Sequence, residues 1–138
     1  MASYRVLEHT ADVGFEAWGA TREEVFANAA CALQDLMVDV ASIEPREETR
    51  VQIEGEDAAS LLVNWLSHIL YLFDGEGRAF GDFKIERLTD RALIATARGE
   101  PFDRERHRVK LQVKAVTYHQ LAIEPTPEGW RAQVFVDI

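Results

Sequence analysis

Residues 61–73 constrain the fold most, because they have the pattern of a helix that is apolar on almost every side. Its apolar positions are Leu61, Leu62, Val63, Trp65, Leu66, Ile69, Leu70, Tyr71, Leu72 and Phe73. Its polar stripe is narrow and consists of Ser60, Asn64, Ser67 and His68. A helix of this kind is buried on several sides, within its own fold or by a partner. Burial within its own fold is the simpler alternative, and it requires neighbouring elements on more than one side.

The pattern along the rest of the chain predicts an α+β fold, two-layered, with two helices packed on one face of a mostly antiparallel sheet. Thr21 and Glu24 have the spacing of a capping box, and the helix that they begin should end near Val38. Asp57 is the expected cap of the apolar helix. Short apolar alternations predict strands at residues 4–7, 14–19, 50–54, 83–88, 93–97, 107–114, 117–123 and 130–136. We expect a single domain over residues 1–138.

The composition excludes several classes of protein. The net charge of -9 opposes strong direct binding of nucleic acid, since an acidic surface repels polyphosphate. No apolar run is long enough to span a bilayer and the first residues lack a signal-peptide pattern, so we expect a cytoplasmic protein without membrane contact. Neither GxGxxG nor a P-loop is present, which argues against nucleotide hydrolysis. The single cysteine, Cys31, has no disulfide partner, and we expect it to be a small buried residue. No histidines or cysteines have the spacing of zinc ligands.

Three carboxylates lie at positions that the fold could bring together. Asp137 is followed by Ile138, whose α-carboxylate ends the chain, and Asp12 lies in an early turn beside His9. Crowded carboxylates repel unless a cation lies between them, and hard divalent cations prefer oxygen ligands. The simpler alternative is a strand that ends on a solvated acid, with Asp12 in an Asx turn, and spacing alone favours it.

A charged loop precedes the predicted strand at residues 107–114. Strand alternation would place its basic residues on one face, namely Arg106, Arg108, Lys110 and Lys114. The usual explanation is a solvated sheet face, and the alternative is a docking strip for a phosphate or an acidic partner. His107 and His119 fall on the opposite parity, which favours hydrogen-bonded histidines of the core or its rim. We predict no catalytic residue, because no triad arrangement is present.

Over its whole length the chain resembles the archease family of small accessory proteins. The matching segments are residues 7–14 (LEHTADVG), 62–73, 106–107, 113–119 (VKAVTYH) and 136–138 (VDI). The resemblance implies a protein that is not itself an enzyme. It implies an activator of the GTP-dependent RNA ligase of tRNA splicing and RNA repair, which promotes guanylylation of that ligase and its multiple turnover.

The same resemblance implies a metal site formed by Asp12, Asp137 and Ile138. The expected cofactor is a divalent cation, with calcium the first choice and magnesium or manganese the alternatives. Further residues are expected beside the site or at the partner surface, namely His9, Lys114, Arg106 and His107. Two other functions remain open: a metal-dependent hydrolase with His9 as acid or base, and a chaperone-like modulator of RNA-processing enzymes that exposes the apolar helix.

Overall fold

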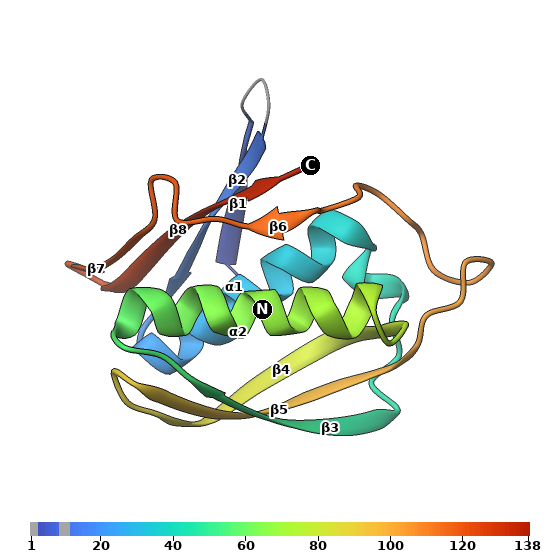
Figure 1. Ribbon diagram of the computed structural model, residues 1–138, viewed down its shortest axis with the longest axis horizontal. Helices are drawn as coiled ribbons and strands as arrows, with labels where there is room; N and C mark the ends of the chain where they lie inside the picture. Colours follow the sequence, from blue (N-terminus) through green and yellow to red (C-terminus); the bar gives the residue numbers. More distant parts are fainter. Residues whose placement is uncertain (1–2, 9–11) are drawn as a thin grey trace.

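The computed structural model describes residues 3–8 and 12–138, and within these ranges the chain forms two long helices and two antiparallel sheets (Figure 1). The five-stranded sheet has the order β1 (Ser3–Glu8), β2 (Asp12–Gly19), β8 (Gly129–Asp137) and β6 (Ala115–Val116), with β7 (Ala122–Thr126) also paired to β8. The three-stranded sheet has the order β3 (Glu47–Glu54), β5 (Ala92–Pro101) and β4 (Arg78–Leu88). The helices are α1 (Arg22–Met37) and α2 (Ala58–Asp74), and a short 3-10 turn, Val40–Ser42, follows α1.

Both helices lie between the two sheets, and this placement follows from the apolar surface of α2. Its buried residues are Leu61, Leu62, Val63, Trp65, Leu66, Ile69, Leu70 and Leu72. The helix contacts β3 and β4 on one side and β6 and β7 on the other, as Figure 1 shows. The predicted α+β fold of two helices with antiparallel strands is confirmed. The strands divide into two sheets, where the sequence predicted one, because a helix apolar on nearly every side needs cover on both sides.

The predicted helix starts are confirmed, because both caps form as their sequences indicate. The Glu24 amide donates to Thr21 Oγ1 at 3.1 Å, and Glu24 Oε2 accepts from the Thr21 amide at 3.3 Å. At α2 the Ser60 amide donates to Asp57 Oδ1 at 2.8 Å, and the Asp57 amide donates to Ser60 Oγ at 3.1 Å. Each cap satisfies amides that have no partner within the helix. Within the described ranges, no helix has the length and apolarity that crossing a membrane requires.

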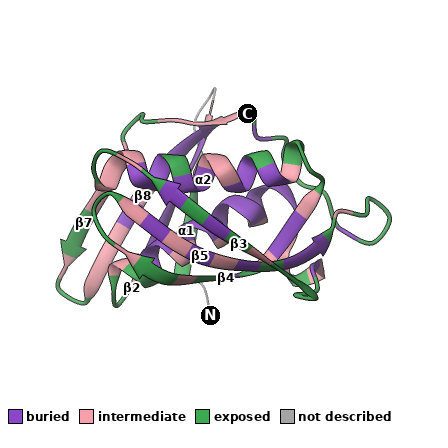
Figure 2. Cartoon of the chain, turned by 60° about the horizontal axis from the view of Figure 1, so that its bottom comes forward, coloured by how far each residue is buried: buried purple, intermediate pink, exposed green. Residues whose placement is uncertain are grey.

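The hydrophobic core lies where the two helices meet the inner faces of the sheets (Figure 2). Trp65 of α2 is fully buried, and its indole Nε1 donates to the Phe26 carbonyl of α1 at 3.0 Å. This bond joins the two helices and satisfies the one polar atom of a large apolar side chain. In the three-stranded sheet, the backbones of β4 and β5 approach each other closely at Gly99. A Cβ at this position would lie 1.8 Å from the Ala79 carbonyl oxygen.

Two of the predicted strands are wrong. Residues 107–114 form an extended segment outside both sheets, joined to the fold by an isolated bridge between Val109 and Val38. The amides of Lys110 and Leu111 bind the Met37 and Leu36 carbonyls at 2.8 and 2.9 Å. These carbonyls end α1 and have no partner within it, so the segment serves as a helix cap rather than as a strand.

The strand predicted at residues 117–123 is mostly a turn, since β6 ends at Val116 and β7 begins at Ala122. Gln120 lies at a φ of 49°, in the left-handed region that a regular strand does not visit. The alternation of apolar residues predicted one continuous strand here, whereas the backbone reverses direction within it.

Candidate metal site

Asp12 and Asp137 are brought together by the pairing of β2 with β8. Asp12 opens β2, Asp137 closes β8, and the register places the two residues directly opposite each other. Side chains of an opposed antiparallel pair project from the same face, with Cβ atoms about 5 Å apart. Asp137 is exposed and Asp12 is partly exposed. Two residues separated by most of the chain thus present carboxylates to the same space at one end of the five-stranded sheet.

This pair lies on the outer face of the sheet, away from the helices. The neighbouring Val13 and Val136 belong to the buried core, so the alternating positions Asp12 and Asp137 point outward. Two residues further along, the Phe135 ring lies over Gly14, where a Cβ would approach it to 2.6 Å. The ring is 98% buried although it lies on this outer face. Gly14 is therefore required by the close approach of the ring beside the carboxylate pair.

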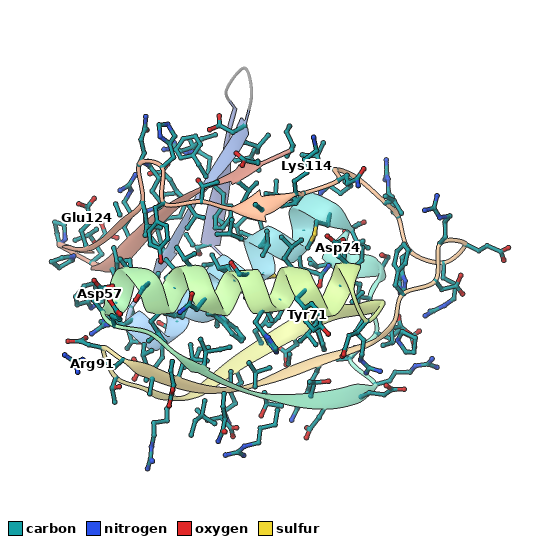
Figure 3. All side chains as sticks on the ribbon, viewed as in Figure 1. Asp57, Tyr71, Asp74, Arg91, Lys114 and Glu124 are labelled. Carbon is teal, nitrogen blue, oxygen red and sulfur yellow. The ribbon has the colours of Figure 1, made fainter. Side chains whose placement is uncertain are left out.

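Segments at both sides of β8 contribute to the same edge. The Lys114 amide donates to the Asp137 carbonyl at 2.8 Å, and Ala115 is the register partner of Asp137 in β6. Figure 3 shows Lys114 at this end of the molecule. Ile138 follows directly, with 39% of its surface exposed. The structure therefore brings Asp12, Asp137, Ile138 and Lys114 to one edge.

The predicted histidines have different positions. His9 lies outside the described residues. His119 is exposed, and its ring meets the edge of Phe135 at a centroid distance of 5.6 Å. It lies at the rim and not in the core. Its closeness to the carboxylate edge could not be found from sequence, because it depends on the turn that interrupts the predicted strand.

The donor set at this edge fits a hard cation. Among the described residues no three His, Cys, Asp or Glu side chains cluster with metal-binding geometry. The predicted site requires only two side-chain carboxylates, with a main-chain carboxylate as the third donor. All three are oxygen donors, which favours calcium, magnesium or manganese over zinc. Opposed like charges in a sheet also cost stability that a cation between them would offset.

Arg106 and His107 are placed in a different site, at the end of β5 in the three-stranded sheet. His107 Nε2 lies 2.7 Å from Glu100 Oε2, and His107 Nδ1 accepts from the Asp103 amide at 2.8 Å. With Nδ1 an acceptor, the ring proton is on Nε2 and points at Glu100. Arg106 forms an ion pair with the same carboxylate. These residues do not join Asp12 and Asp137.

The Glu100 carboxylate is fully buried, and its charge is stabilised by four groups. Burial raises the pKa of Glu100, but hydrogen bonds more than offset it and lower the pKa to about 2. The Glu44 amide donates at 2.9 Å, alongside His107 and Arg106. Arg46 lies 3.4 Å from the second oxygen. The cluster fixes the start of the loop that leads to Lys114. The prediction that His107 is a hydrogen-bonded histidine of the core is confirmed.

The fold and the edge together describe a small α+β protein whose candidate site is an exposed pair of carboxylates. The family model of the archease protein family matches residues 4–138. Protein archease of Pyrococcus furiosus is 46% identical over 142 residues, covering 100% of both chains. Protein archease of Methanosarcina mazei is 43% identical, covering 98% of this chain and 95% of its own. The chain belongs to the archease family.

Solved structures agree with this fold. The solution structure of Methanobacterium thermoautotrophicum protein 1598 superposes with a TM-score of 0.81 at 38% identity and 98% coverage of both chains. The crystal structure of an archease from Thermotoga maritima, described as a possible chaperone, gives 0.67 at 25% identity, covering 96% of this chain and 94% of its own. The predicted family and fold class are thus confirmed.

Proposed function

We propose that this protein is a metal-binding accessory protein that activates a GTP-dependent RNA ligase in tRNA splicing and RNA repair. The observation on which the proposal rests is the register pairing of Asp12 with Asp137 at one end of the five-stranded sheet, in a chain of the archease family. A bound divalent cation would retain coordination positions beyond those that these residues fill, and such positions can accept an oxygen from a partner or its nucleotide. The role of the chain is to hold that ion at a surface a partner can reach.

This end of the sheet suits the role because its backbone is held firmly and its side chains are accessible. Asp12 and Asp137 are held by the continuous pairing of β2 with β8, which extends to the register pair Gly19 and Trp130. Lys114 is fixed beside them through its backbone bond to Asp137. Its side chain is exposed, so a phosphate that approaches this end of the sheet could bridge the lysine and an ion.

The net charge of -9 also suits a protein partner that binds RNA. A ligase needs a basic surface for its substrate, and an acidic protein is steered toward such a surface. The same charge opposes direct RNA binding by this chain. The expected partner is therefore the ligase itself, met in the cytoplasm.

The other functions fit the structure less well. A hydrolase would need a substrate cavity beside its metal, yet the cavity of about 480 Å³ near Trp18 and Trp130 and the groove of about 320 Å³ beside Val109 include neither Asp12 nor Asp137. A chaperone-like action would not use α2 as its client surface, because that helix is buried between the sheets. Any such action would use the exposed edges.

Guanylylation of the ligase measures the proposed activity. Asp12→Asn and Asp137→Asn should each abolish most of the stimulation and weaken binding of calcium and manganese in titration calorimetry. Asp82→Asn is the matched control, since Asp82 is an exposed acid on β4, in the three-stranded sheet. Full stimulation by both edge variants would contradict the metal role, and absence of stimulation by the unaltered protein would refute the ligase role.

A second variant tests the terminal carboxylate separately. One residue added after Ile138 moves the α-carboxylate away while leaving both aspartates in place. We expect weaker metal binding with an unchanged circular dichroism spectrum. Unaltered affinity would show that the main-chain carboxylate is not a ligand.

A further inference from the structure

The segment at residues 104–114 concentrates positive charge on an acidic protein. Its basic residues are all exposed, and they are Arg104, Arg106, Arg108, Lys110 and Lys114. These are five of the 15 lysines and arginines of a chain whose net charge is -9. Two have intramolecular partners: Arg106 pairs with Glu100, and Lys110 lies 3.7 Å from Asp35. Within the described part of the chain, Arg104, Arg108 and Lys114 form no ion pair, so their charges remain available to another molecule.

The same segment exposes apolar side chains. Val109 is 49% exposed and Leu111 is 38% exposed. Both line a groove of about 320 Å³, whose other apolar lining residues are Met37, Phe73, Phe102 and Val113 and whose charged lining residues are Asp74, Arg104 and Lys110. That volume lies in the range of sites that bind small groups and side chains. The groove therefore combines an apolar floor with a charged rim in which two basic residues, Arg104 and Lys110, outnumber one acid, Asp74.

The groove is held in place before any partner binds. Phe102 stacks on His107 at a centroid distance of 5.6 Å and meets the edge of Phe73 at 5.1 Å. His107 is in turn fixed by the buried Glu100. On the other wall, Leu111 is tied by its amide to the end of α1. A site ordered in this way loses little conformational entropy on binding.

We propose that this groove binds an acidic peptide segment of a partner protein, with an apolar side chain inserted beside Val109 and Leu111. Charge complementarity selects the acid, because the groove carries a net positive charge from Arg104, Lys110 and Asp74, with the exposed Arg108 beside it, in a chain that otherwise repels anions at long range. The apolar floor, with the Phe102 ring already engaged, favours a peptide over RNA. Single-stranded RNA binds by stacking bases on open aromatic faces, whereas Phe102 already stacks on His107. This surface is distinct from the Asp12–Asp137 edge, so the inference stands apart from the proposed function.

The probe is a fluorescent peptide of about twelve residues in which Asp and Glu alternate with Leu, titrated with the whole protein and followed by anisotropy. Saturable binding is expected, with amide NMR shifts confined to the groove at residues 102–113 and the neighbouring ends of α1 and α2. Replacing each Leu of the peptide by Ser should weaken binding about tenfold, since the inserted apolar surface is lost. Raising the salt concentration should weaken it further.

Matched variants separate the groove from general charge and apolarity. Arg104→Glu and Val109→Ser should each weaken binding about five- to tenfold. Lys84→Glu changes the net charge equally on β4, and Val6→Ser removes a valine that is 45% exposed on β1. Both should change affinity less than about twofold.

Three results would overturn the proposal. Absence of saturable binding up to about 1 mM would exclude the affinity that such a groove supports. Equal losses in the control variants would show non-specific attraction. Tighter binding of a single-stranded RNA with the same charge as the peptide would assign the surface to nucleic acid instead.

Discussion

Replacing Glu100 with glutamine should change how stability depends on pH, because this buried carboxylate is ionised in the folded protein. Its pKa is about 2, below the ordinary value of 4.5. The folded state therefore binds a proton at Glu100 less readily than the unfolded state does. The stability that results is fully present above about pH 4.5 and is lost as the pH falls toward 2.

The size of the effect follows from the two pKa values. A difference of this size corresponds to about 3 kcal/mol between the ionised and protonated forms of the folded protein. By linkage, about 2 kcal/mol of it is lost by pH 3. Glutamine mimics the protonated group, so Glu100→Gln should be less stable by about 3 kcal/mol at pH 7 and by only about 1 kcal/mol at pH 3.

Urea denaturation from pH 7 to pH 3 measures this gap directly. Groups that do not contact Glu100 titrate in both proteins and cancel, so the difference in free energy of unfolding reports Glu100 together with its hydrogen-bond partner His107. Glu48→Gln is the control, because Glu48 pairs with Arg98 on the surface and its side chain is 61% exposed. It should cost at most about 1 kcal/mol, with little pH dependence. A gap for Glu100→Gln that stays constant from pH 7 to pH 3 would refute the reasoning.

The remaining predictions concern local structure and are measured by urea denaturation at pH 7. Trp65→Phe removes the 3.0 Å bond to the Phe26 carbonyl and leaves a cavity, which should cost about 2–3 kcal/mol. Gly99→Ala forces a Cβ to within 1.8 Å of the Ala79 oxygen, so the strands must separate and the loss should reach about 3 kcal/mol or prevent folding. Thr21→Ala removes the acceptor at the start of α1 and should cost about 1 kcal/mol. Losses below about 0.3 kcal/mol would contradict each assignment.

Local signals in the sequence predicted the helices well. The starts of α1 and α2 depend on local capping residues, so Thr21 with Glu24, and Asp57, could be recognised without knowledge of the fold, whereas the reciprocal bond from Ser60 appears only in the structure. The two strands predicted at residues 83–88 and 93–97 likewise correspond to β4 and β5. The division into two sheets could not be predicted, because it depends on how both sides of α2 are covered.

The geometry of the candidate site could not be predicted from local sequence signals either. The pairing of Asp12 with Asp137 joins residues from opposite ends of the chain, and register is a tertiary property that spacing does not contain. Only the resemblance to a family indicated that these carboxylates meet. The predicted neighbours Arg106 and His107 share the family pattern, yet they bind Glu100 in the other sheet. A segment that resembles the family can therefore serve a buried cluster as readily as a site.

The segment that failed as a strand connects the two surfaces for which we propose functions. Its amides at Lys110 and Leu111 bind the end of α1, and three residues later the Lys114 amide binds the Asp137 carbonyl. A regular strand would have used these amides alternately in ladders with neighbouring strands. These amides instead bind the end of a helix and the end of a sheet. One short stretch of backbone therefore holds both the groove and the carboxylate pair in place. A change in the backbone of this segment would therefore disturb both surfaces, because the groove and the Asp137 end of the sheet depend on the same few amides.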